Sequence, residues 1–117
     1  MPPASPKRTL ATCCAAHMLH DGLSDISYVL LPILAQAFNL SLAQVGVIRS
    51  AHRAAMALFQ TPAGLVAERL GARNLLAFGT ACAGLAFIAL GQSAGFAAIL
   101  LTLFCAGFGS AFQHPLC

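Results

Sequence analysis

Residues 74–117 read NLLAFGTACAGLAFIALGQSAGFAAILLTLFCAGFGSAFQHPLC and contain no Asp, Glu, Lys or Arg. A water-facing surface does not tolerate so long an uncharged stretch, because roughly a quarter of the residues in an ordinary soluble domain are charged. A membrane-spanning helix needs about 20 mostly apolar residues, and the short turn at 91–93 divides this stretch into two segments of about that size. The stretch therefore predicts two transmembrane helices, at about 74–90 and 94–117.

The rest of the chain has the same apolar character. The 117 residues are 59% hydrophobic and 8% charged, with a formal net charge of +3, and the mean hydropathy is +0.83. Two more apolar segments predict spans at about 10–36 and 43–67, with Ser41 as the N-cap of the second. The proline-rich residues 1–9 are expected to form a disordered tail. The sequence thus predicts an all-α membrane protein with about four transmembrane helices in residues 10–117, and excludes a soluble enzyme or a nucleic-acid-binding protein.

The basic residues that flank the spans predict their orientation. Lys7, Arg8, Arg69 and Arg73 fall on one side of the bilayer if the spans alternate, whereas the opposite connections, 38–42 and 91–93, carry no charge. Because flanking Lys and Arg residues stay on the cytoplasmic side, we expect the N-terminus, the loop at 68–73 and the C-terminus to be cytoplasmic.

The cysteines give no sign of a metal or cofactor site. They are odd in number, form no C-x-x-C pair and lie in or beside apolar segments: Cys13, Cys14, Cys82, Cys105 and Cys117. Such residues behave as small buried hydrophobic side chains. We therefore expect neither disulfides nor a bound metal or cofactor.

Four charged residues lie inside the expected spans: Asp21, Asp25, Arg49 and Arg53. Each would cost about 2.5–3.5 kcal/mol at the centre of a lipid-facing helix, so they are expected to face inward. Their helical spacing agrees, because polar residues form one stripe on each helix. The stripes comprise His17, Asp21, Ser24, Asp25 and Tyr28 on the first span, and Arg49, His52, Arg53, Met56 and Gln60 on the second.

Depth in the membrane predicts which of these groups meet. At about 1.5 Å of rise per residue, Asp25 and Arg53 lie at nearly the same height, so we expect them to be in contact. Asp21 is then nearer the cytoplasm and Arg49 nearer the outside. The same count places His114 level with His17 and His20. These imidazoles serve as interhelical hydrogen-bond partners or as proton carriers, and a metal site is a third interpretation that no recognised ligand spacing supports.

Residues 64–73, GLVAERLGAR, resemble the signature between spans two and three of major facilitator superfamily transporters, G-x-x-x-D-R/K-x-G-R-R/K. Four positions match: Gly64, Arg69, Gly71 and Arg73. Glu68 replaces the usual Asp, and Ala72 replaces the first basic residue of the closing pair. The match also lies in the expected place, after the second span and on the basic side.

Other segments are similar to one branch of that superfamily, the fosmidomycin-resistance transporters. They are AHMLHDG at 16–22, QTPAG at 60–64 and GFGSAFQHP at 107–115. The branch comprises proton-coupled drug efflux antiporters of the bacterial inner membrane. The resemblance therefore implies a multi-pass inner-membrane protein whose partners are the lipid bilayer, protons and a small-molecule substrate.

The resemblance also implies roles for individual residues. Glu68 would latch the cytoplasmic side of the N-terminal half to the C-terminal half, while Arg69 and Arg73 would set the topology and the conformational balance. Asp21 or Asp25 would be the proton-coupling acid.

Length is the largest departure from the family. Its members have twelve spans in two halves, whereas this sequence offers only the first spans of the N-terminal half. We therefore expect a fragment whose partner, the C-terminal half, is missing and which does not transport alone. Two alternatives remain open at this point: a small four-span multidrug transporter that works as an oligomer, with Asp21 or Asp25 as its essential acid, and a non-transporting remnant.

Overall fold

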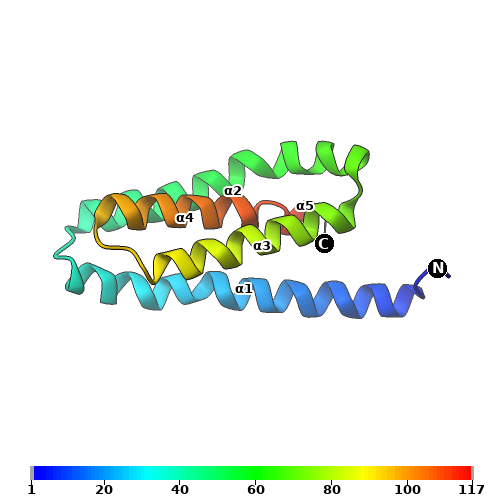
Figure 1. Ribbon diagram of the computed structural model, residues 1–117, viewed down its shortest axis with the longest axis horizontal. Coiled ribbons are helices and arrows are strands. Elements are labelled where there is room, and N and C mark those ends of the chain that lie inside the picture. Colours follow the sequence, from blue (N-terminus) through cyan, green and yellow to red (C-terminus); the bar gives the residue numbers. More distant parts are fainter. Residues whose placement is uncertain (1, 117) are drawn as a thin grey trace.

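The computed structural model describes residues 2–116, and every regular element in that range is a helix. The elements are α1 (Pro6–Ala37), α2 (Leu42–Leu70), α3 (Ala72–Leu90), α4 (Phe96–Ser110) and the single turn α5 (Gln113–Leu116). Successive long helices run antiparallel, so the two ends of the described chain lie at the same end of the bundle (Figure 1). We call this the Gly71 end, because the α2–α3 joint lies there, and the opposite one the Ser41 end.

Two serines begin the first two helices. Ser41 is the N-cap of α2, as expected: its side chain accepts a hydrogen bond from Gln44 N, and the Gln44 side chain accepts one from Ser41 N, a capping box. Ser5 caps α1, with Pro6 in the first turn. Because proline suits that position, α1 starts at Pro6, and residues 6–9 are helical rather than part of the expected tail. Met1 lies outside the described residues.

The expected charged loop between the second and third helices is much shorter than its sequence indicated. α2 continues to Leu70 and α3 begins at Ala72, so Gly71 alone forms the joint, with φ 87°. Side chains other than glycine rarely adopt this backbone conformation. The Gly71 of the signature is therefore required by the backbone, and its neighbours Glu68 and Arg69 are helical.

The expected fourth span is interrupted near its end. α4 stops at Ser110, residues 111–112 form a turn, and α5 follows. Within the described range, Ala72–Leu90 and Phe96–Leu116 are both long and apolar enough to cross a membrane. α1 and α2 are longer, 32 and 29 residues, but each carries a polar stripe that lowers its mean hydropathy. Cys117, the last residue of the expected span, lies outside the described residues.

The α4 helix packs closely against α2 and α3 because glycines remove side chains at both crossings. A Cβ added at Gly107 would clash with the His52 carbonyl oxygen of α2. One added at Gly109 would lie 2.6 Å from the Gly79 carbonyl oxygen of α3. The three helices α2, α3 and α4 thus form one closely packed unit.

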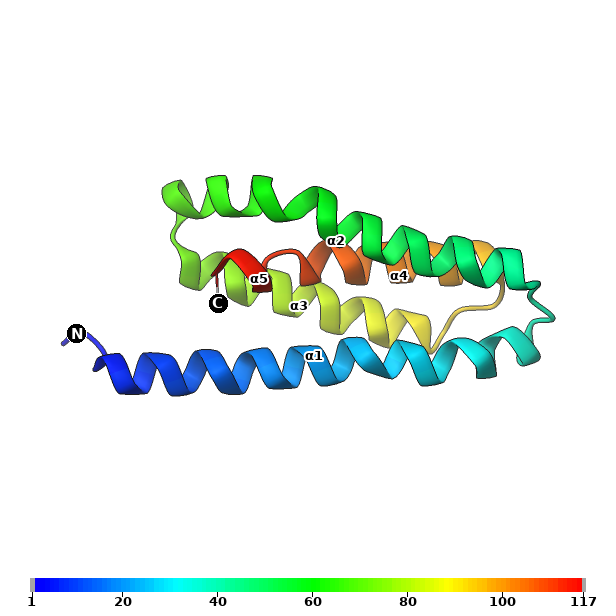
Figure 2. The same ribbon diagram turned by 180° about the vertical axis from the view of Figure 1, so that it is seen from behind.

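The α1 helix runs along the side of this unit at a greater separation (Figure 2). It is anchored at the Ser41 end, where Leu31 joins a buried apolar cluster with residues of α2, α3 and α4: Ile48, Leu90, Ile99 and Leu103. A second small cluster, Ala63, Leu75 and Phe112, closes the Gly71 end of the other helices. Between these levels, polar side chains separate α1 from α2 and α4.

Candidate functional site

A polar cavity of about 270 Å³ lies between α1 and the rest of the bundle. Its walls come from four helices and include both expected acids and both expected arginines. The lining residues are His20, Asp21, Ser24, Asp25, Ser27, Tyr28 and Leu31 of α1, Arg49, His52, Arg53 and Met56 of α2, Leu103 of α4 and His114 of α5. All four charged residues line this cavity, although each of them is exposed, so their orientation away from lipid stays a prediction. Of the two polar stripes, only His17 and Gln60 do not line the cavity.

Two arginines of α2 meet a tyrosine of α1 across this cavity. The Arg53 guanidinium donates a hydrogen bond to the Tyr28 hydroxyl, and the Arg49 guanidinium carbon lies 4.7 Å from the centre of the Tyr28 ring. This distance is within the range of a cation–π interaction. Tyr28 thus holds two cations on one aromatic side chain.

The expected contact between Asp25 and Arg53 is wrong. Among residues 2–116, the one ion pair found joins His17 to Asp21, and Arg53 binds Tyr28 instead. Both Asp25 and Arg53 line the cavity, so the height estimate was adequate. The error arose because Tyr28 lies three residues after Asp25 on the same stripe. Its side chain is longer and neutral, and its hydroxyl accepts the hydrogen bond of the Arg53 guanidinium.

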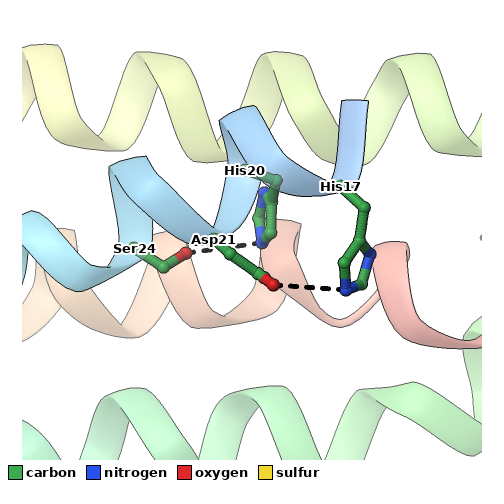
Figure 3. Close-up of polar contacts among 4 residues, drawn as sticks. All are labelled: His17, His20, Asp21 and Ser24. Carbon is green, nitrogen blue, oxygen red and sulfur yellow. Dashed lines mark hydrogen bonds and ion pairs between the residues drawn. The ribbon is translucent and has the colours of Figure 1, made fainter. Parts of the chain in front are cut away.

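Histidines gather at the end of the cavity nearest the Gly71 end. His17 Nε2 lies 3.3 Å from Asp21 Oδ2, and His20 Nε2 lies 3.4 Å from Ser24 Oγ (Figure 3). The rings of His17 and His114 are in edge-to-face contact, with centroids 5.4 Å apart. The expected proximity of His114 to the α1 histidines is therefore confirmed.

Two further lining residues were in the stripes but were not singled out as site residues. Tyr28 organises the arginines, and His52 is 7% exposed, with its Nδ1 2.9 Å from the Leu103 carbonyl oxygen. If Nδ1–H donates to that carbonyl, Nε2 is the nitrogen left to accept a hydrogen bond while the ring is neutral. Their position on the inward-facing stripe was the signal that could have identified both.

The signature residues lie away from the cavity. Gly64 faces α5, where an added Cβ would lie 3.6 Å from Pro115 Cβ. Glu68, Arg69 and Arg73 are exposed at the Gly71 end, and none of them forms an ion pair within the described part of the chain. In that same part, no three His, Cys, Asp or Glu side chains are arranged to hold a metal ion.

These features define a class: an all-helical bundle with apolar outer surfaces and a charged cavity inside, the arrangement of a multi-span membrane protein. The sequence profile of the Major Facilitator Superfamily matches residues 13–117. The chain belongs to this family of membrane transporters, and the match favours that resemblance over a small four-span transporter.

A curated relative gives the same assignment. The chain is 28% identical over 99 residues to the protein named "Uncharacterized MFS-type transporter YfnC" of Bacillus subtilis (strain 168). The match covers 85% of this chain and 24% of the relative, so the chain spans about a quarter of that protein's length. No solved structure matches the chain.

Proposed function

We propose that this chain supplies the first spans of the N-terminal half of a proton-coupled efflux transporter, similar to the fosmidomycin-resistance branch, for a small molecule or drug. It would lie in the inner membrane with its N-terminus in the cytoplasm. The single observation that carries the proposal is the cavity, which Asp21, Asp25, Arg49 and Arg53 line together. Ionisable groups inside a membrane-spanning segment are costly and are retained where they bind ions or substrate.

Asp25 is the carboxylate most available for proton coupling. Asp21 already pairs with His17, whereas Asp25 lines the cavity and has no ion-pair partner among residues 2–116. An unpaired carboxylate in a cavity can bind either a proton or a donor group of the cargo. Exchange of one for the other at a single group couples their movements in opposite directions.

Arg49 and Arg53 supply the opposite side of the cargo site. Their guanidinium groups surround Tyr28 and have no carboxylate within ion-pair distance in the described chain. They therefore keep donors for acceptor atoms of a cargo, and Tyr28 holds them in place. Glu68, which is exposed at the Gly71 end, is the proposed latch toward the other half of the transporter.

Proton coupling can be tested in everted membrane vesicles from cells that express the complete twelve-span transporter to which this chain would contribute its first spans. With an imposed pH gradient reported by a fluorescent dye, addition of fosmidomycin or ethidium is expected to dissipate the gradient. Asp25→Asn should reduce this response at least about fivefold, the lower limit of usual coupling between two ligands. Lys7→Gln, which also removes one charge but lies outside the cavity, should leave it unchanged.

Two results would contradict parts of this proposal. If neither compound moves protons in the wild-type vesicles, proton-coupled efflux of these drugs is wrong. If Asp25→Asn responds like the wild type while Asp21→Asn does not, the coupling acid is Asp21. Immunoblots of the vesicles establish that each variant is present in equal amount.

A further inference from the structure

A second hollow of the molecule lies at the Gly71 end, between α1 and α3. It is a groove of about 520 Å³, within the size range of ligand pockets, roughly 300–1,000 Å³. Its lining includes Arg8, Thr9 and Thr12 of α1, Arg73 and Leu76 of α3, and Leu116 of α5. None of these residues lines the polar cavity, so the groove is a separate feature.

This part of α1 has no apolar packing against the neighbouring helices. The apolar cluster at the Gly71 end consists of Ala63, Leu75 and Phe112, and no α1 residue packs against it within the described chain. Leu31 anchors α1 only at the opposite end. The groove is therefore a space between two helices, and its surface is mostly apolar. In a bilayer such a space is filled, because an empty one would forfeit the dispersion contacts of its lining.

Two arginines stand at the mouth of the groove. Arg8 lies in the first turn of α1 and Arg73 in the first turn of α3, and both helices begin at the Gly71 end (Figure 1). Both side chains are exposed, and neither has a carboxylate within ion-pair distance among residues 2–116. The hydroxyl groups of Thr9 and Thr12 donate to carbonyl oxygens of their own helical segment. The two guanidinium groups are therefore the donors that the groove can offer to a ligand.

The groove becomes apolar with distance from these arginines. At about 1.5 Å of rise per residue, Leu76 lies roughly 4.5 Å further into the bundle than Arg73, and Thr12 roughly 6 Å further than Arg8. Leu76 and Leu116 are both half-buried in the wall. The groove thus has a cationic mouth and an apolar interior, which match the two ends of a phospholipid. Basic pockets between transmembrane helices are known binding places of anionic headgroups.

We propose that this groove binds an anionic phospholipid, with the phosphate between Arg8 and Arg73 and one acyl chain between α1 and α3. Phosphate oxygens accept paired hydrogen bonds from guanidinium groups, and the acyl chain supplies the apolar contacts that α1 lacks at this end. Charge complementarity selects a lipid over a further apolar helix, which would offer no anion to the two arginines. The bound lipid fastens the start of α1 to the start of α3. This inference goes beyond transport and does not depend on it.

Lipid selectivity is measured by native mass spectrometry of the purified 117-residue chain in detergent. The chain is titrated with phosphatidylglycerol, which is anionic, or with phosphatidylcholine of the same acyl chains, which has no net charge. The apparent affinity for phosphatidylglycerol is expected to be higher by about tenfold or more, because each of two basic residues near a lipid headgroup contributes about fivefold. Equal affinity for the two lipids would overturn the proposal.

Variants at the Gly71 end locate the binding. Arg8→Gln and Arg73→Gln should each weaken phosphatidylglycerol binding about fivefold and leave phosphatidylcholine binding unchanged. Lys7→Gln and Arg69→Gln are matched controls, because each removes the same charge from the same end but neither residue lines the groove. These controls should bind phosphatidylglycerol like the wild type. Equal losses in all four variants would show general attraction to a basic surface and would contradict a site in the groove. Far-UV circular dichroism establishes that each variant is folded.

The place of the acyl chain is measured independently by fluorescence. The chain contains no tryptophan, so Leu76→Trp places a single fluorophore in the groove. Leu10→Trp is the control, because Leu10 is 66% exposed on α1 and does not line the groove. Phosphatidylcholine vesicles that contain a minor fraction of phosphatidylglycerol brominated on its acyl chains should quench Leu76→Trp more strongly than Leu10→Trp. Addition of Arg8→Gln to Leu76→Trp should remove the difference.

Inorganic phosphate distinguishes a lipid from a free anion. An excess of it should leave the quenching of Leu76→Trp unchanged, because phosphate alone brings no acyl chain into the groove. Reversal of the quenching by phosphate would assign the arginines to a free anion, and equal quenching at positions 76 and 10 would show that no lipid chain is held there. Either result overturns the proposal. None of these measurements needs a cargo or a proton gradient, so their failure is distinguishable from failure of the efflux assay.

Discussion

Tyr28 decides how the charges of the cavity are arranged at the scale of single residues. Helix depth alone placed Arg53 level with Asp25, but counting residues fixes height only to about one turn, or roughly 5.4 Å. Tyr28 lies within that margin on the same stripe. Its hydroxyl accepts from Arg53 and its ring lies under Arg49, which leaves Asp25 unpaired within the described residues.

This arrangement predicts which side chains are energetically coupled. In a double-mutant cycle, Tyr28→Phe and Arg53→Gln should be non-additive, because either change alone removes the same hydrogen bond. Asp25→Asn and Arg53→Gln should be close to additive. Thermal unfolding in detergent, followed by far-UV circular dichroism, measures both cycles. Coupling between Asp25 and Arg53 as large as that between Tyr28 and Arg53 would restore the contact expected from the sequence.

At the scale of elements, glycines set how closely α4 approaches its neighbours. Gly107 and Gly109 are small residues of the kind that lets helices pack closely in multi-span proteins. Only the structure shows that Gly107 meets the α2 backbone at His52, whereas Gly84 of α3 has no atom within 4 Å of an added Cβ. Gly84 and Gly107 are both glycines in apolar segments, but only Gly107 lies against the backbone of a neighbouring helix.

Gly107→Ala is therefore expected to destabilise the bundle by about 1–3 kcal/mol or more, because the added methyl group forces α2 and α4 apart. Gly84→Ala is the matched control and should change the stability by less than about 1 kcal/mol. Unfolding midpoints in a denaturing detergent give both values. Equal effects at the two positions would show that the α2–α4 crossing is not as close as described here.

The antiparallel order of the four long helices governs the whole molecule. It brings the basic residues Lys7, Arg8, Arg69 and Arg73 to the Gly71 end and the uncharged 91–93 turn to the other. Large apolar side chains remain exposed on the outer faces, among them Met18 at 76% and Leu85 at 66%. Such surfaces suit contact with lipid or with further transmembrane helices.

Membrane orientation can be tested with one introduced cysteine at each end of the bundle, after the native cysteines are replaced by Ala. A membrane-impermeant thiol reagent is expected to label Gln92→Cys in intact spheroplasts, because the Ser41 end should face outward. Asn74→Cys should be labelled only in inside-out vesicles. Labelling of Asn74→Cys from the outside would reverse the orientation expected from the basic residues.

The sequence by itself determined the class of the protein. Local composition shows that residues 74–117 are uncharged and that Ser41 caps the start of α2. The helical period shows the polar stripes of α1 and α2. Neither property depends on which helices pack against each other. Helix ends were less certain, because α1 started earlier than its apolar segment and Gly71 shortened the signature loop to one residue.

Only the tertiary structure decided which polar groups meet. Each of these contacts depends on how two helices are rotated and separated. They are the hydrogen bond of Arg53 to Tyr28 rather than Asp25, the contact of His17 with His114, and the close approach of Gly107 to His52. Periodicity gives the face of a helix to within a stripe several residues long, whereas a hydrogen bond or ring contact is set within a few tenths of an ångström. That difference in length scale is the physical reason why the polar stripes could be predicted and the pairings of their side chains could not.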